Sequence, residues 1–168
     1  MKLNIGASNS EGIYRNSEWL NFDLINHKRI DVIGNAIKLP FTENSFDEIH
    51  CIHVLEHMTR EKQVPVLKEM QRVLKEGCSA YIEVPDIITV AKRMVKAYED
   101  KDFEQSRIWT VSMYGKSERE GMAHHWGFSK HYLATKIAKA GFKAFGFPTE
   151  MISSHYKQEP VILIRGIK

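Results

Sequence analysis

The sequence of 168 residues has little of several features that define other protein classes. It holds only two cysteines, Cys51 and Cys78, and both fall in apolar stretches. Two such thiols indicate reduced packing residues rather than a disulfide framework, so we expect a cytoplasmic protein. No apolar run approaches the roughly 20 residues of a membrane span, and the N-terminus lacks the pattern of a signal peptide.

Concentrated charge is also missing. Lys and Arg number 24 against 21 Asp and Glu, and the basic residues are scattered along the chain. This pattern argues against a dedicated nucleic-acid binder. The full G-x-G-x-x-G motif of nicotinamide-dependent oxidoreductases is absent too. What remains is a hydrophobic share of 43% and a charged share of 27%, which are typical of a globular protein with one domain over residues 1–168.

The stretch 39–57 carries the strongest structural signal. Its residues 46–52 are too apolar for a surface loop and too closely spaced for one face of a helix, so they predict a buried central strand. His53 would follow the carboxyl end of this strand, where ligands collect in open α/β sheets.

Similar patterns predict the other elements. We expect six further strands and three helices, at Leu3–Gly6, Trp19–Asp23, Ile30–Ile33, Cys78–Val84, Phe142–Phe147 and Pro160–Ile167 for the strands and Thr59–Lys75, Thr89–Tyr98 and Ser129–Ala140 for the helices. Gly77 is the expected stop of the first helix. A crossover between parallel strands normally needs a dozen or more residues, and fewer separate Asp23 from Ile30. The N-terminal helices must therefore be short or absent.

Three short runs of residues carry a resemblance to a known family. Leu-Pro-Phe at 39–41, Asn-Ser-Phe-Asp at 44–47 and Val-Leu-Glu-His at 54–57 resemble the middle of a class I S-adenosylmethionine-dependent methyltransferase of the small type 11 kind. The resemblance implies an α/β fold with a Rossmann-like, mostly parallel seven-stranded sheet, helices on both faces and reduced helices near the N-terminus. It also implies S-adenosylmethionine as cofactor and S-adenosylhomocysteine as product.

The first two strands end in residues that suit this cofactor. Gly6, Ala7 and Ser8 are small, so the backbone could approach a ligand closely, although most single glycines after a strand only make a turn. The resembled family has more glycines in this loop. Asp23 could accept hydrogen bonds from both ribose hydroxyls, or be a solvated turn residue. Leu24 is assigned to the same cofactor site.

The next two strand ends complete the predicted cofactor site. The resemblance puts Asn35 and Ala36 at the adenine edge, although Gly-Asn is also a common turn. It puts His53 beside the methionine part of the cofactor. His53, Glu56 and His57 also match the letters H-x-x-E-H of a zinc peptidase. Because His53 ends a strand, the two rings need not share a helical face, and we expect no metal site.

The acceptor side is predicted from what remains. Residues 87–128 form an insertion too long for an ordinary connection, which indicates a functional segment. Its candidate pocket residues are Tyr98, Trp109, Tyr114, Arg119, His124, His125 and Trp126. His57, His124 and His125 are candidate general bases, because imidazole titrates near neutral pH, and His57 and His124 are the two assigned to catalysis. Each could equally be a structural histidine.

Two functions follow from these patterns. The first is methyl transfer from S-adenosylmethionine to a small molecule, sugar or lipid precursor, with no membrane span and no nucleic-acid partner. The second is a catalytically silent partner subunit that binds the cofactor, for which the thin N-terminal half and the shortened glycine loop are the motive. A homodimer is compatible with both, since a partner chain could cover the sheet edge.

Overall fold

A seven-stranded sheet forms the centre of the molecule in the computed structural model, which describes residues 1–8, 12–116, 121–148 and 159–168. Its strands are β1 (Lys2–Ile5), β2 (Trp19–Asp23), β3 (Val32–Ile33), β4 (Phe46–Ile52), β5 (Leu74–Pro85), β6 (Ala144–Gly146) and β7 (Val161–Ile167). Their order is β3-β2-β1-β4-β5-β7-β6. The first five are parallel, and β7 runs antiparallel to both of its neighbours. The predicted α/β fold with a mostly parallel sheet is confirmed.

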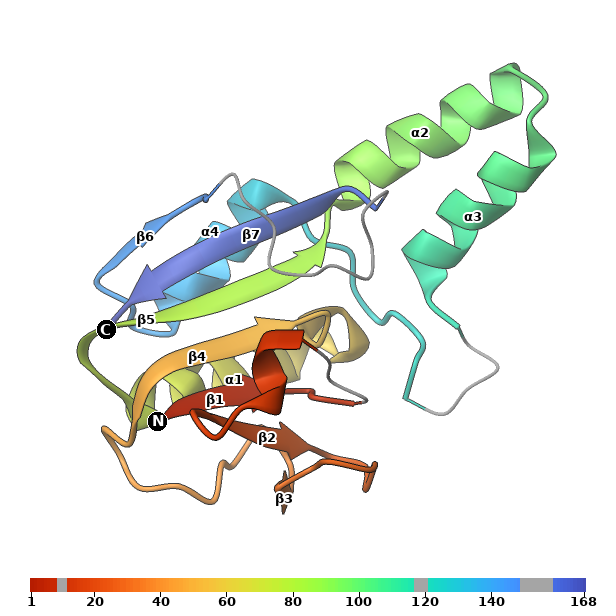
Figure 1. Cartoon of the computed structure of the whole chain (residues 1–168). Helices are drawn as coiled ribbons and strands as arrows, with labels where there is room; N and C mark the ends of the chain where they lie inside the picture. The colour runs from red at the N-terminus through yellow and green to blue at the C-terminus, as the bar shows by residue number, and fades with distance from the viewer. Residues whose placement is uncertain (9–11, 117–120, 149–158) are drawn as a thin grey trace.

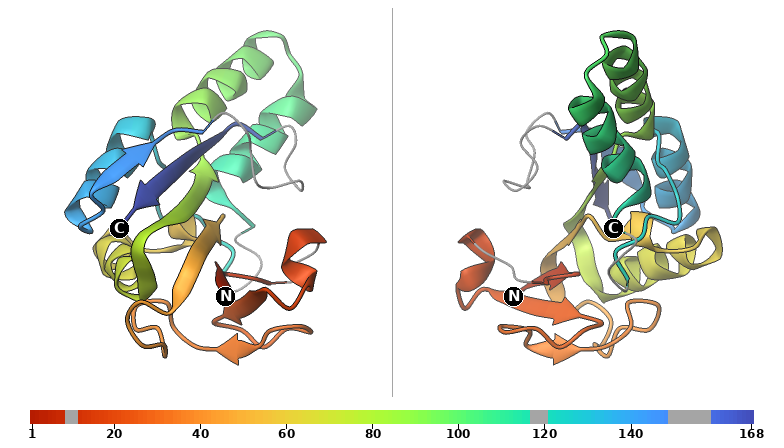
Figure 2. Two further views of the ribbon diagram at one scale, coloured as in Figure 1. Left: turned by 60° about the vertical axis from the view of Figure 1, so that its left-hand side comes forward. Right: turned by 90° about the vertical axis from the view of Figure 1, so that its right-hand side faces the viewer.

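Some helices lie against the sheet and others project from it (Figures 1 and 2). Helices α1 (Arg60–Val73) and α4 (Lys130–Lys139) lie on one face of the sheet, and the short 3-10 helix η1 (Gly12–Arg15) lies on the other side, next to β2. Helices α2 (Ile87–Glu99) and α3 (Phe103–Tyr114) form an antiparallel pair that projects from the carboxyl end of β5. Among the described residues, no helix is long and apolar enough to cross a membrane.

Strand β4 is buried because both of its faces are covered. Ile49 and Cys51 are fully buried in the main core, together with Val66, Leu67 and Met70 of α1. His50 lies on the opposite face, since side chains alternate along a strand, and its Nδ1 is 2.9 Å from the Tyr14 hydroxyl of η1. A strand covered on both faces has a nearly continuous run of apolar residues, so β4 could be predicted from the sequence.

Several boundaries differ from the sequence prediction. Helix α1 ends at Val73 rather than Lys75, because Leu74 is fully buried and already pairs with Phe46 in the sheet. Gly77 therefore lies within β5, with a φ of +74°, and does not stop the helix. Strand β3 has only two residues where four were expected. Thr59 occupies the N-cap position of α1 without a side-chain hydrogen bond.

Two further features were misjudged. Helix α3 was not predicted, because many of its apolar side chains, Phe103 and Ile108 among them, are exposed and give no clear helical stripe. Cys78 is only half-buried, whereas Cys51 is fully buried as expected, and both are free thiols. The helix begun by Ser129 is confirmed, since its side chain accepts a hydrogen bond from the Tyr132 backbone.

Candidate functional site

Four neighbouring parallel strands end at one edge of the sheet. In the order β3-β2-β1-β4 their carboxyl ends lead into Asn35, Asp23, Gly6 and His53. The strands are joined at this edge by backbone bonds, since Gly6 donates to the Phe22 carbonyl and Gly34 to that of Asp23, both at 2.9 Å. The predicted cofactor residues are therefore brought together, at the edge where parallel α/β sheets bind ligands.

The turn after β1 requires glycine for a steric reason. Gly6 has a φ of +72°, and a Cβ added to it would lie 2.2 Å from Cγ2 of Val54. Ala7 is buried, and Ser8, with a φ of +44°, is exposed. The backbone of this turn thus runs directly beside the segment that follows β4.

Asp23 organises the ends of two strands. Its Oδ2 accepts a hydrogen bond from the Ser8 backbone at 2.7 Å, and its Oδ1 accepts one from the Ile25 backbone at 2.9 Å. A carboxylate offers about four lone-pair sites, so each oxygen can still accept from a hydroxyl. Leu24 beside it is 65% exposed and leaves an apolar side chain open to a ligand.

Asn35 and Ala36, which follow β3, offer polar groups to the same edge of the sheet. The Oδ1 of Asn35 accepts from the Ile37 backbone at 3.0 Å, which is the geometry of an Asx turn. Its side-chain NH₂ remains a donor at an exposed position. The methyl group of Ala36 packs in the main core, so only the Ala36 backbone is available to a ligand.

His53 is held between two buried carboxylates. It has a φ of +55°, its Nδ1 lies 3.0 Å from Oε1 of Glu56, and its Nε2 lies 3.5 Å from Oε1 of Glu83. Burial alone would lower the pKa of His53, but the two carboxylates outweigh it and raise that pKa to about 10. The ring is therefore a cation that neutralises buried negative charge at the end of β4.

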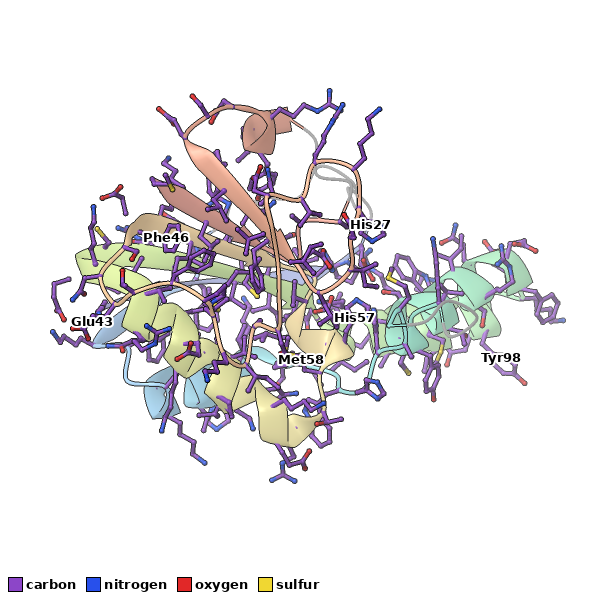
Figure 3. All side chains as sticks on the ribbon, turned by 90° about the horizontal axis from the view of Figure 1, so that it is seen from below. His27, Glu43, Phe46, His57, Met58 and Tyr98 are labelled. Atoms are coloured by element: carbon purple, nitrogen blue, oxygen red, sulfur yellow. The ribbon has the colours of Figure 1, made fainter. Side chains whose placement is uncertain are left out.

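A cavity of about 240 Å³ lies next to this cation. It is lined by His53, Glu56, His57, Ile108, Trp109, Val111, Ser112, Gly115, Lys116, Met122, His124 and Glu159. Figure 3 shows His57 at the end of the sheet that faces the α2–α3 pair. The cavity thus joins the end of β4 to residues of the 87–128 segment.

The two predicted bases face each other in this cavity. His57 belongs to the 3-10 helix η2 (Leu55–His57), and its ring centroid lies 4.8 Å from that of His124. The Nδ1 of His57 is 3.1 Å from the Ala123 carbonyl. Burial lowers the pKa of His124, although the nearby charge of Glu56 opposes this. A neutral His124 can accept a proton or bind a cation.

Backbone bonds hold the 87–128 segment in place. The Ile87 N–H donates to the Phe128 carbonyl at 3.0 Å, so the two ends of the segment lie side by side. The His125 and Trp126 N–H groups donate to the Glu56 carbonyl at 2.7 and 3.2 Å. The position of His124 relative to η2 is therefore set by the main chain.

The predicted acceptor residues are only partly brought together. Trp109 and His124 line the cavity. Tyr98 and Tyr114 are 70% and 62% exposed, and His125 is also exposed. The Trp126 ring contacts Arg60 and Tyr132. Arg119 lies outside the described residues.

Sequence reasoning missed most of the lining of this cavity, including three polar residues. Ser112, Lys116 and Glu159 line it, and Glu159 is hydrogen-bonded to Ser112. Burial raises the pKa of Glu159, which lies just before β7. No motif in the sequence links a residue near the last strand to this cavity, because only the antiparallel return of β7 carries it there.

Comparison with known proteins agrees with this geometry. Residues 12–82, from η1 into β5, match a family model described as a methyltransferase domain. The fold is that of the class I methyltransferases. An S-adenosylmethionine-dependent methyltransferase from Thermotoga maritima matches with a TM-score of 0.61 at 20% identity, over 99% of this chain and 81% of its own. The resemblance seen in the sequence is confirmed.

Two further proteins extend the comparison with this methyltransferase fold. The Burkholderia thailandensis 1,6-didemethyltoxoflavin-N1-methyltransferase, solved with its substrate and S-adenosylhomocysteine, matches with a TM-score of 0.61 at 12% identity, over 99% of this chain and 70% of its own. An uncharacterised methyltransferase of Schizosaccharomyces pombe is 28% identical over 129 residues, 76% of this chain and 45% of its own length. The chain spans 36% to 55% of the length of the curated relatives it matches.

Proposed function

We propose that this protein transfers a methyl group from S-adenosylmethionine to a small molecule, sugar or lipid precursor. The observation that carries the proposal is the alignment of Gly6, Asp23, Asn35 and His53 at four adjacent parallel strand ends. A continuous edge of this kind fits an extended nucleoside with an amino-acid tail, because each strand end can serve a successive part of the ligand.

The cofactor lies along this edge in the proposal. Asp23 accepts from the ribose hydroxyls with its remaining lone pairs, and Leu24 offers an apolar contact to the nucleoside. Asn35 and the Ala36 backbone hold the adenine edge. The methionine part lies against the backbone of Gly6, Ala7 and Ser8 and reaches the end of β4 at His53, whose ring nitrogens already face Glu56 and Glu83.

The acceptor occupies the cavity between η2 and the 87–128 segment. This segment is the substrate-side insertion of a single domain, since its two ends meet at the Ile87–Phe128 bond and its middle lines the cavity. The sulfonium methyl is already electrophilic, so the protein mainly aligns a nucleophile behind it and excludes water. His57 or His124 takes the proton if the acceptor must lose one.

A ligand-binding experiment tests the proposal. S-adenosylhomocysteine at about a hundred times its dissociation constant should add roughly 2.7 kcal/mol of apparent stability, seen as a rise in melting temperature. NAD at the same concentration is the control and should produce no rise. The proposal is abandoned if S-adenosylhomocysteine at millimolar concentration leaves the melting temperature unchanged.

Two aspartate variants locate the ligand. Asp23→Ala should weaken S-adenosylhomocysteine binding by about 1.5–3 kcal/mol, the scale of hydrogen bonds to a charged group. Asp31→Ala is the matched control, because Asp31 also accepts a backbone hydrogen bond, from Asn21 at 2.7 Å, but precedes β3. Calorimetry measures both affinities. Equal affinities in the two variants would show that Asp23 only shapes the turn.

One observation favours the silent partner subunit as a second candidate. Among the described residues, only η1 lies on the sheet face opposite α1 and α4, so that face has little helical cover. A partner chain or a second copy would cover it. Stable binding of S-adenosylhomocysteine without turnover of S-adenosylmethionine on any acceptor, together with a stable complex on size-exclusion chromatography, would favour this function.

A further inference from the structure

A cluster of metal-binding side chains lies in the wall of the acceptor cavity. Glu56, His57 and His124 each offer one ligand atom, and these atoms lie within 4.8 Å of one another. Ligand atoms around a zinc ion at about 2.0–2.2 Å are separated by roughly 3–3.5 Å, so small side-chain rotations close the set. The cluster combines residues far apart in the chain.

A hydrogen bond orients one of the two imidazoles for metal binding. A carbonyl oxygen only accepts, so the His57 Nδ1 that faces the Ala123 carbonyl must carry the proton. The lone pair of His57 is then on Nε2. Metal-bound histidines usually donate their other ring N–H in this way, which orients the ring before the ion binds.

The burial of the Glu56 carboxylate is a second, independent observation that points to a bound cation. Glu56 is 1% exposed, and its Oε1 faces the His53 ring at 3.0 Å. Its Oε2 is buried and has no hydrogen-bond partner within the described part of the chain. An unsatisfied buried carboxylate oxygen is costly. A cation between Glu56 and the two histidines would satisfy it.

We propose that Glu56, His57 and His124 bind a divalent first-row transition-metal ion of the zinc class. Two imidazoles with one carboxylate form the ligand set of catalytic sites that keep a position open for water or substrate. This set differs from the one that the H-x-x-E-H letters suggest, because His124 lies far from that motif in the sequence. His53 instead orients Glu56, and the third ligand comes from beyond α3.

The metal site would also define the class of acceptor, and this part of the inference rests on the proposed function. An ion facing the cavity would hold an acceptor through oxygen and lower the pKa of its hydroxyl group. The hydroxyl proton leaves to water. The acceptor oxygen then forms a bond to the methyl carbon while the bond between that carbon and the sulfonium sulfur breaks. The products are a methyl ether and S-adenosylhomocysteine. The acceptor class is therefore a hydroxyl compound. With the ion bound, the two histidines serve as its ligands, so the role of base given to them above applies only to the metal-free protein.

Metal binding can be measured without any acceptor. Tag-free protein is titrated with Zn²⁺ by calorimetry and with Co²⁺ by visible absorption, with Mg²⁺ as the comparison. We expect one ion per chain, ligand-field bands with Co²⁺, and no competition from a tenfold excess of Mg²⁺. Binding of Mg²⁺ in preference to Zn²⁺ and Co²⁺, or far less than one ion per chain, would overturn the assignment.

Variants identify the ligands. His57→Gln, His124→Gln and Glu56→Gln should each weaken Zn²⁺ binding at least tenfold. His125→Gln is the matched control, because this neighbouring side chain is exposed and does not line the cavity, and it should bind as the wild type does. An equal loss in His125→Gln, or unchanged binding in His57→Gln, would refute the site.

S-adenosylhomocysteine affinity is measured on the same samples and separates the two proposals. Retained cofactor binding in the variants shows that they fold, so a lost ion can be assigned to a lost ligand. Cofactor binding without Zn²⁺ binding refutes the metal site alone. Zn²⁺ binding without cofactor binding refutes the proposed methyltransferase function and leaves the metal site standing.

Discussion

Gly6 carries two constraints that can be separated by substitution. Its φ of +72° is costly for other residues, and its missing side chain makes room for Val54. Gly77 has nearly the same φ, +74°, but no atom lies within 4 Å of the position where a Cβ would be added. The two glycines therefore differ in steric crowding and not in backbone conformation.

Alanine substitution should reveal this difference. Gly77→Ala is expected to cost about 1 kcal/mol of unfolding free energy from backbone strain alone, whereas Gly6→Ala should cost about 2–4 kcal/mol because a clash is added. Chemical denaturation measures both. The double variant Gly6→Ala with Val54→Ala should recover part of the loss relative to the sum of the single variants. Equal costs for the two glycine variants would contradict the clash.

At the scale of elements, α2 and α3 form a unit with its own small core. Trp109 is 8% exposed and packs with Val90 and Ala97, and the Arg93 guanidinium lies 5.0 Å from its ring. This cluster is separate from the main core. A unit with few buried contacts of its own is expected to open locally without global unfolding.

Trp109→Ala should therefore loosen the helix pair selectively. Removing the largest side chain of the small core is expected to reduce amide protection over residues 87–114 by about tenfold or more, while β4 and β5 keep theirs. Hydrogen exchange followed by mass spectrometry measures this. Tyr98→Ala is the control, since Tyr98 is 70% exposed and lies far from the sheet in Figure 3. Equal loss in β4 and β5 would show that the pair is not an independent unit.

At the scale of the whole molecule, a buried histidine in the central strand links stability to pH. His50 is 5% exposed and lies between the Tyr14 hydroxyl at 2.9 Å and Oε1 of Glu48 at 3.1 Å. Burial lowers the pKa of His50 to about 3, and the charge of Lys2 adds to this, while the charge of Glu83 opposes it. The folded protein thus keeps His50 neutral at a pH where the unfolded chain protonates it.

The sign of the effect follows from proton binding. Between pH 6.5 and about 3 the unfolded state binds a proton at His50 that the folded state does not, so stability falls as pH falls through this window. From pH 7 to pH 5 the loss is about 2 kcal/mol. His50→Gln should remove this part of the slope in denaturation curves, and His131→Gln, on the exposed surface of α4, should not. Parallel pH curves for wild type and His50→Gln would contradict the burial of a neutral ring.

The sequence alone determined the seven strands in their chain order and the residues at the ends of the first four. Trp19–Asp23 and Phe46–Ile52 were predicted with their observed bounds, because a strand whose side chains are buried carries its own apolar pattern. Gly6 and His53 could be found because they directly follow such strands, and Asp23 because it ends one. Asn35 lies two residues after the short β3. Parallel strands then bring their carboxyl ends to one edge whatever the details of packing.

Only the tertiary structure decided the cavity at the end of β4 and its charges. Glu56, His57, His124 and Glu159 come from three separate parts of the chain, and no local spacing records that they meet. The resemblance of His53, Glu56 and His57 to a zinc motif was misleading as a pattern, because the left-handed turn at His53 directs its ring toward Glu56 and Glu83. Long-range backbone bonds from His125 and Trp126 to Glu56 instead place the His124 ring beside that of His57.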